Sequence, residues 1–300
     1  MNFPVKYQNG NTFVSIHSDG TKVREYSGLP SIVHPESIDV KITNYCDMGC
    51  SYCHESSTTS GVHGDLDKLL NILAGLPAGV ELAIGGGNPL SHPGLVEFLQ
   101  KLKDRGIIAN LTVNQGHLKT YQGLLTYLVK EELVHGLGIS ITSNNFAYVK
   151  PLLELTKNIV YHLIAGVNKV EVVEKLMDLG ECKVLLLGYK LFGFGLRHHS
   201  DAVDSELKRW YKALPSLLGK CTISFDNLAI EQLRVRRLLT HDGWAKFYMG
   251  DDFCFTMYID AVKQEYAPTS RSNDRVSFSH CSLLEYFERN GKINEYSGSH

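Results

Sequence analysis

Three cysteines lie close together early in the chain, with Cys46, Cys50 and Cys53 in a C-x3-C-x2-C pattern. Thiolates are ligands for zinc and for iron–sulfur clusters. Three thiolates on one short loop do not complete the four-ligand shell of structural zinc. They can bind three irons of a four-iron cluster and leave the fourth iron open to another ligand. A zinc site completed by a distant Cys or His, and free or redox-active thiols, remain as alternatives.

A second segment with chemical potential is Glu81–Pro89, which reads as a strand ending in three glycines. Glycines at a strand end let the backbone approach a ligand closely and expose peptide groups. A plain turn before the next helix would explain the glycines alone. Because Gly86 follows Cys53 by 33 residues, at the end of the next predicted strand, the two segments together favour one shared site.

The elements that must position these segments alternate between strand and helix from Ser37 onward. The alternation predicts right-handed crossovers and a parallel sheet, and the nearly continuous apolar strands fit a sheet covered on both faces. Ligands bind such sheets at the carboxyl ends of the strands, which is where both segments lie. We predict strands at 38–43, 80–84, 107–113, 138–142, 159–164 and 183–187, and helices at 66–76, 94–104, 118–130, 147–155 and 170–179.

We divide the chain into an N-terminal β-hairpin extension over 1–35, an α/β core over 36–199 and a mixed α+β extension over 200–300. The hairpin is indicated by Asp19-Gly20 between two β-prone runs. In the C-terminal extension we predict a helix over 201–218 and strands over 222–230 and 253–262. The polar loop that follows, 266–271, is a candidate lid.

Composition excludes several classes of protein. The chain has 300 residues, 43% hydrophobic and 21% charged, with a formal net charge of −2, so it is typical of a globular protein without a global basic field. Seven cysteines are too few and too unevenly spaced for a disulfide scaffold in a chain this long. No apolar signal core or membrane-spanning run is visible, so we expect a cytoplasmic protein without membrane partners.

The two motifs resemble those of the radical S-adenosylmethionine (SAM) superfamily. The family's C-x3-C-x2-C motif is matched by Cys46, Cys50 and Cys53, and its Gly-Gly-Glu-Pro motif is matched by Gly86, Gly87, Asn88 and Pro89. The resemblance covers roughly residues 37–190. It implies a partial (β/α)6 barrel, which the C-terminal extension would cover. Asn88 departs from the usual Glu, so it can accept a hydrogen bond from the cofactor's amino group but without a charge.

The resemblance also implies the cofactors and the chemistry. A [4Fe–4S] cluster would reductively cleave SAM, and the resulting 5′-deoxyadenosyl radical would remove a hydrogen atom from a substrate. An electron donor such as flavodoxin or ferredoxin would be a partner. Further cofactor contacts are implied at Tyr52, for adenine, and at the polar strand residues Thr112, Asn114, Ser140 and Thr142, although loop packing or structural hydrogen bonds would also account for these residues.

Catalytic candidates are less specific. Lys190 and Arg197 follow the last predicted core strand and would suit a carboxylate or phosphate, or they form a solvated loop. Cys254 and Cys281 could donate a hydrogen atom to a product radical. A second cluster formed by Cys182, Cys221, Cys254 and Cys281 is also conceivable, but ordinary buried cysteines remain the leading interpretation.

The substrate class stays open at this point. A small or peptide-linked amino acid is one option, and a modified nucleoside or a base in nucleic acid is the other. The second option rests on a loose similarity to phage-type members linked to nucleic-acid hypermodification, and the net charge does not support it. The basic run Leu233–Arg237 fits a solvated helix face better than a nucleic-acid site. A different class of function is a non-catalytic iron–sulfur or zinc protein acting as a sensor or interaction module.

Overall fold

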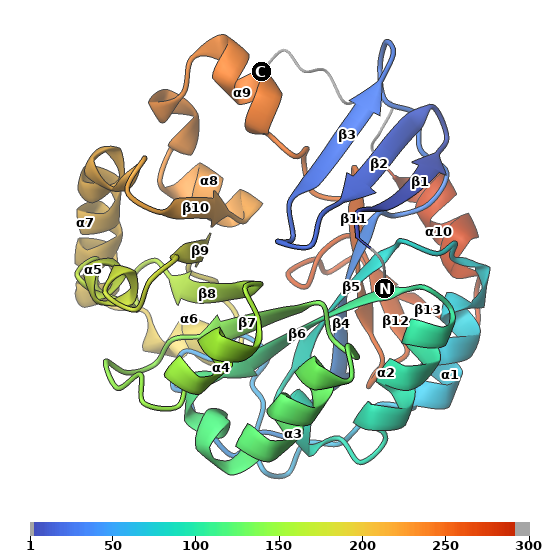
Figure 1. The fold of residues 1–300 in the computed structure, drawn as a ribbon, viewed down its shortest axis with the longest axis horizontal. Coiled ribbons are helices and arrows are strands. Elements are labelled where there is room, and N and C mark those ends of the chain that lie inside the picture. The colour runs from blue at the N-terminus through green and yellow to red at the C-terminus, as the bar shows by residue number, and fades with distance from the viewer. Residues whose placement is uncertain (1–2, 292–300) are drawn as a thin grey trace.

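The computed structural model describes residues 3–291 and is built around a ten-stranded sheet (Figure 1). Six consecutive parallel strands form its centre, each hydrogen-bonded to the next. The pairing confirms the predicted α/β class with a largely parallel sheet. These strands are β4 (Ser37–Thr43), β5 (Glu81–Gly86), β6 (Ile108–Asn114), β7 (Gly136–Ser140), β8 (Ile159–Ile164) and β9 (Lys183–Leu187).

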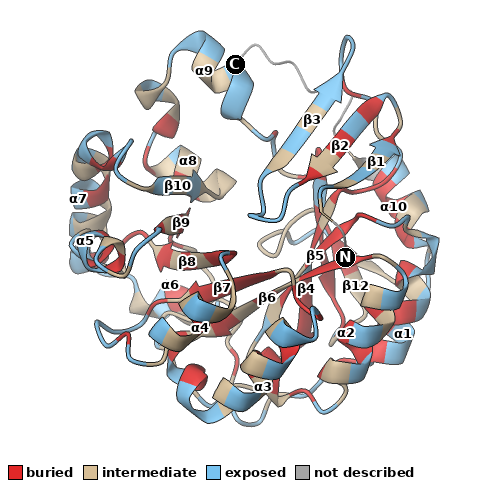
Figure 2. Ribbon diagram, viewed as in Figure 1, coloured by how far each residue is buried: buried red, intermediate tan, exposed pale blue. Residues whose placement is uncertain are grey.

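Helices cover the convex face of this sheet, where the apolar core lies (Figure 2). Along β6, Ala109, Leu111 and Val113 are buried and alternate with the half-exposed Asn110, Thr112 and Asn114. Because successive side chains point to opposite faces of a strand, the polar set faces the concave side. The helices are α1 (Leu66–Ile72), α2 (Leu95–Asp104), α3 (Leu118–Lys130), α4 (Lys150–Leu155) and α5 (Val172–Met177), with short 3-10 turns η1 (Leu73–Gly75), η2 (Pro89–Ser91) and η3 (Gln115–His117).

The C-terminal third of the chain extends the sheet at both edges. β10 (Thr222–Phe225) pairs in parallel with β9, and β11 (Thr256–Asp260) pairs in parallel with β4. β12 (Glu265–Ala267) and β13 (Val276–Ser277) then continue as antiparallel strands. Because β10 and β13 end the strand order, the sheet forms an open, partial barrel rather than a closed one. The helices here are α6 (Phe194–His198), α7 (Asp201–Leu217), α8 (Asn227–Gln232), α9 (His241–Phe247) and α10 (Leu283–Asn290), and η4 (Val235–Leu238) is a 3-10 turn.

Three predicted strands differ most from the bounds in the structure, whereas the other core strands match within one or two residues. The strand predicted over 222–230 ends at Phe225, because the Asp226 side chain accepts a hydrogen bond from Ala229 N and starts α8. The strand predicted over 253–262 begins at Thr256, after Phe253 has taken a positive φ of 68°. The strand predicted over 138–142 lies two residues earlier, so Thr142 follows β7 rather than ending it.

The N-terminal segment forms its own antiparallel sheet of β1 (Val5–Asn9), β2 (Thr12–Ile16) and β3 (Lys22–Tyr26). The predicted hairpin turn at Asp19-Gly20 is present, and β1 is an additional strand. The turn reaches the amino-terminal end of the parallel strands, where Lys183 Nζ donates to Asp19 O at 3.0 Å. Within residues 3–291, no helix is long and apolar enough to cross a membrane.

Candidate functional site at the carboxyl edge of the parallel strands

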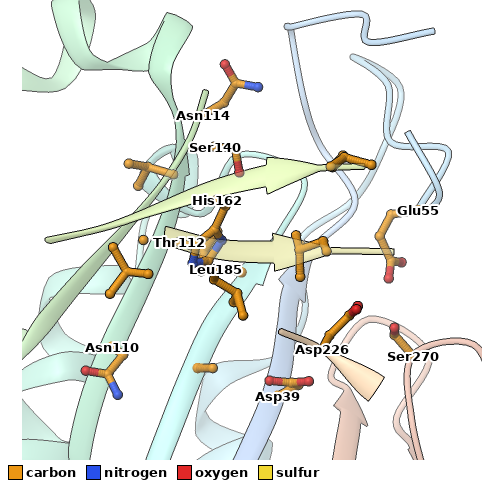
Figure 3. Close-up of a pocket in the computed structure, with 18 of the residues that line it drawn as sticks. Asp39, Glu55, Asn110, Thr112, Asn114, Ser140, His162, Leu185, Asp226 and Ser270 are labelled. Atoms are coloured by element: carbon orange, nitrogen blue, oxygen red, sulfur yellow. The ribbon is translucent and has the colours of Figure 1, made fainter. Parts of the chain in front are cut away.

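A cavity of about 630 Å³ lies on the concave side of the sheet (Figure 3). Every parallel strand from β4 to β9 contributes to its wall. The polar face of β6 supplies Asn110, Thr112 and Asn114, and the opposite side carries Asp39, Glu55, Asp226 and Ser270. The cavity thus brings together chemistry-bearing residues from distant parts of the sequence.

The three cysteines of the C-x3-C-x2-C motif all line this cavity and are partly exposed. They lie on the loop that follows β4, where Cys53 N donates to Cys50 O at 3.1 Å and Cys46 N donates to Thr58 O at 2.9 Å. Burial raises the pKa values of Cys46 and Cys50, and the neighbouring cysteines raise them further. Metal binding would reverse this effect, because a coordinating thiol is deprotonated.

The spacing of the thiols bears on what they can hold. Ligands bound to a single zinc at about 2.3 Å lie within roughly 4 Å of one another. Among the described residues, the ligand atoms that lie within 4.8 Å of one another belong to Cys46, Asp47 and His117, so the three cysteine sulfurs do not form such a set. The cysteines therefore fit a cluster that offers each sulfur a separate iron better than they fit one shared ion.

The glycines at the end of β5 hold the cysteine loop against the sheet. A Cβ on Gly87 would lie 2.1 Å from Tyr45 O, and one on Gly86 would lie 2.5 Å from Thr43 O. Gly87 N donates to Thr43 O at 2.8 Å, and Asn88 N donates to Tyr45 O at 2.7 Å. Gly86 and Gly87 thus make room for protein backbone, whereas Gly85 is the glycine whose Cβ would meet only Thr112 across the cavity.

Asn88 and Pro89 are buried and start η2 outside the lining of this cavity. The Asn88 side-chain oxygen accepts from Leu90 N at 3.2 Å, and its amide group lies 3.5 Å from the Tyr121 hydroxyl. The oxygen that the sequence offers to a cofactor is therefore used to cap a 3-10 turn.

Four of the five other predicted cofactor contacts line the cavity, namely Tyr52, Thr112, Asn114 and Ser140. Asn114 Nδ2 lies 3.8 Å from Cys50 Sγ, which ties the end of β6 to the cysteine loop. Burial raises the pKa of Tyr52, so its hydroxyl stays protonated. Thr142 is exposed and lies outside the lining, with its hydroxyl 3.5 Å from Asn114 Oδ1.

One of the four catalytic candidates is in the cavity. Lys190 lines it, and its Nζ lies 3.1 Å from Ser270 Oγ and 3.2 Å from His54 Nε2. Arg197 is exposed on α6 and lies over the Phe194 ring. Cys254 is buried and Cys281 packs against the core, both outside the cavity lining.

Sequence reasoning missed several charged residues of the cavity. Asp39 and Lys41 alternate along β4, a period of two that places both side chains on the concave face. Lys41 Nζ pairs with Glu55 at 2.8 Å and with Asp260 at 3.2 Å. His162 on β8 also faces the cavity, and burial lowers its pKa to about 4. The alternation of Asp39 and Lys41 with the apolar Ile38, Val40 and Ile42 was the available signal.

Comparison with known proteins identifies a family and several similar folds. The Radical SAM superfamily model matches residues 40–190. The structure of SuiB from Streptococcus suis bound to the precursor peptide SuiA is similar with a TM-score of 0.63 and 12% identity, over 90% of this chain and 68% of that one. SuiB bound to S-adenosylmethionine is similar with a TM-score of 0.58 and 12% identity, over 85% of this chain and 64% of that one.

A curated relative is the probable GTP 3′,8-cyclase of Methanothermobacter thermautotrophicus, 28% identical over 95 residues, which are 30% of this chain and 31% of that protein. The match thus spans about a third of the relative's length. The structural likenesses show the fold alone. Because the family model covers half of this chain, including all three cysteines, the chain belongs to the radical SAM superfamily of enzymes, whose members use a [4Fe–4S] cluster and SAM.

Proposed function

We propose that this enzyme holds its cluster on Cys46, Cys50 and Cys53, binds SAM along the carboxyl edge of β5, β6 and β7, and removes a hydrogen atom from an amino-acid or peptide-type substrate. The observation that carries the proposal is that the three thiols, Gly85 and the polar ends of β6 and β7 all line one cavity. The cavity also extends beyond them to Lys190 and Asp226, which leaves space for a second molecule.

The bound cofactors would supply a one-electron cleavage of SAM and a carbon-centred radical that takes the substrate hydrogen. The chain's own residues position the reactants and exclude water. Gly86 and Gly87 fix the cysteine loop, Gly85 leaves the floor of the cavity free of side chains, and Asn114 and Ser140 offer hydrogen bonds at the same edge. The pKa of His162 is depressed by burial, so its imidazole is neutral at physiological pH and does not protonate a bound group.

A peptide-type or amine-bearing substrate is supported by two features. The fold is similar to that of SuiB, whose structure contains a precursor peptide. The cavity wall carries Asp39, Glu55 and Asp226, and a phosphate-bearing nucleotide or nucleic acid would place like charge beside these carboxylates. We further propose that a flavodoxin or ferredoxin supplies the electron.

Anaerobic reconstitution tests this function. Protein treated with iron, sulfide and reductant should take up about four irons at the triplet and release 5′-deoxyadenosine when SAM is added. Cys50→Ala should reduce both readouts to background, while Cys221→Ser, a thiol outside the cavity, should leave both unchanged. Release of 5′-deoxyadenosine by the Cys50→Ala protein, or a colourless wild-type protein with one zinc, would overturn the assignment.

A further inference from the structure

The side of the cavity that faces β10 and β11 carries an excess of carboxylate, which we call the acidic wall and define as Asp39 and Asp226. Both side chains also line a second cavity of about 350 Å³ between the two edges of the open sheet. Figure 3 shows them on the same side as Ser270, across from Asn110 and Thr112. The acidic wall therefore stands where the two cavities meet.

The cations around this wall already have partners. Lys41 is paired with Glu55 and Asp260, Lys22 with Glu81 at 2.5 Å, and Arg24 with Glu36 at 2.7 Å. Arg271 is paired with Asp252 at 2.6 Å. Among the described cations that line the two cavities, Lys190 is the one without a carboxylate partner, and its ammonium group lies 3.1 Å from Ser270 Oγ and beside His54. One lysine engaged elsewhere does not balance two carboxylates.

The carboxylates themselves have free hydrogen-bonding capacity. Asp226 Oδ1 accepts from Gly188 N at 2.9 Å and from Ala229 N at 2.7 Å, so this oxygen serves the backbone. Within residues 3–291, no hydrogen bond or ion pair joins the Asp39 carboxylate to a protein donor, and its electrostatic neighbours Lys190, Asp226 and Asp252 act on it without a hydrogen bond. The Asp39 side chain is exposed where it lines the two cavities, so a ligand can reach it. Desolvation by the surrounding protein raises the pKa of Asp39; Lys190 lowers this pKa, and Asp226 and Asp252 raise it. A ligand cation would relieve this cost.

Strand register places Asp39 well below the cysteine loop. It lies level with Ala83 on β5 and Asn110 on β6, whereas the cysteine loop begins beyond Thr43, which is level with Gly86. Four residues of strand correspond to about 13 Å. A group bound at Asp39 is therefore at a distance from the thiols that leaves room for the rest of a substrate between them.

We propose that Asp39, assisted by Asp226, binds a cationic nitrogen of the substrate, as found in a primary amine or a guanidinium group. This inference rests on the proposed function for the identity of the cavity as a substrate site, and it names the substrate class. Asp39 acts here as a binding and specificity residue, because a paired carboxylate and cation fix both position and charge.

Binding of matched small probes tests the proposal without the cluster or SAM. The probes are the N-acetyl methylamides of lysine, arginine, norleucine and glutamate, titrated into the full chain and followed by ligand-observed NMR. In the wild type, the lysine or arginine probe should bind at least about tenfold more tightly than the norleucine probe, and the glutamate probe more weakly still. Asp39→Asn keeps the shape of the side chain and should abolish the preference, while Asp201→Asn, at an exposed position of α7, should keep it.

The outcomes separate the two proposals. Equal binding of lysine, arginine and norleucine probes by the wild type, or an unchanged preference in a folded Asp39→Asn protein, would overturn the role of Asp39. If Asp39→Asn does not fold, the comparison of probes on the wild type still decides. A protein that prefers cationic probes but cannot cleave SAM would contradict the proposed function only, and one that cleaves SAM without any preference would contradict this inference only.

Discussion

The two functional regions of the cavity are built in different ways. The cysteine edge, which we define as Cys46, Cys50, Cys53, Gly86 and Gly87, comes from the loop after β4 and from the end of the adjacent strand β5. The acidic wall joins Asp39, early in the sheet, to Asp226 on the far edge, 187 residues later. The first region depends on local spacing and on close backbone packing. The second exists only because the open sheet curves until β10 approaches β4 and β11. The proposed cofactor site is thus fixed locally, whereas the proposed substrate site depends on how far the open sheet curves.

The largest effect is expected at Lys41, which links the cysteine loop to the sheet edge through Glu55 and Asp260. Lys41 has only 5% of its side chain exposed, and Lys41→Met leaves two carboxylates without their cation. We expect the free energy of unfolding to fall by about 3–5 kcal/mol in urea titrations. Lys101→Met, which removes an exposed pair with Glu97 and Asp67, should change it little. Equal losses in the two variants would show that the buried network does not stabilise the cavity.

Gly87→Ala should affect the cysteine edge specifically. The added Cβ meets Tyr45 O at 2.1 Å, so the cysteine loop must move, at a cost of about 3 kcal/mol. Iron uptake on reconstitution should fall as well. The matched control is Gly123→Ala on α3, where a Cβ meets no atom within 4 Å and should stabilise the helix by up to about 1 kcal/mol. If Gly87→Ala is as stable and takes up as much iron as the wild type, the close packing at Gly87 is not required.

His162 should make stability depend on pH. Its folded-state pKa of about 4 lies below the ordinary value of about 6.5. Between these values the unfolded chain binds more protons, so this contribution is complete above pH 6.5 and is lost as the pH falls towards 4. His162→Gln should flatten the loss by at most about 3 kcal/mol, seen as a smaller difference between urea midpoints at pH 7 and pH 4.5. An unchanged pH dependence would show that the imidazole is not desolvated.

The smallest effect is expected at Asn88, where the motif departs from the family pattern. Asn88→Ala removes the cap on Leu90 N and should cost about 1 kcal/mol of unfolding free energy. Since Asn88 lies outside the cavity lining, the dissociation constant for SAM should stay within about threefold of the wild type. A loss of tenfold or more in SAM affinity would instead show that Asn88 contacts the cofactor, as the motif implies. Gly123→Ala again serves as the folding control.

The sequence contained strong signals for the core and weak ones for its edges. β8 and β9 have the bounds predicted from their apolar runs, and α3 begins and ends where its periodicity indicated. The strand predicted over 222–230 begins as predicted but ends at Phe225, because Asp226 caps a helix, and the hydrophobic pattern does not reveal that capping role. The cysteine edge could be predicted because the residues of each motif lie close together in the sequence. Asp39, His162 and Asp226 were missed because their proximity depends on pairing between distant strands. The division at residues 35 and 199 stays a prediction.

An anaerobic crystal structure of the reconstituted protein with SAM would show directly whether the cysteine edge holds a cluster. We expect a four-iron cluster bound by Cys46, Cys50 and Cys53, with SAM against Gly85, Asn114 and Ser140. Open space should continue from there to Asp39 and Asp226. A single metal ion held by Cys46, Asp47 and His117, with no cluster on Cys50 and Cys53, would contradict this expectation.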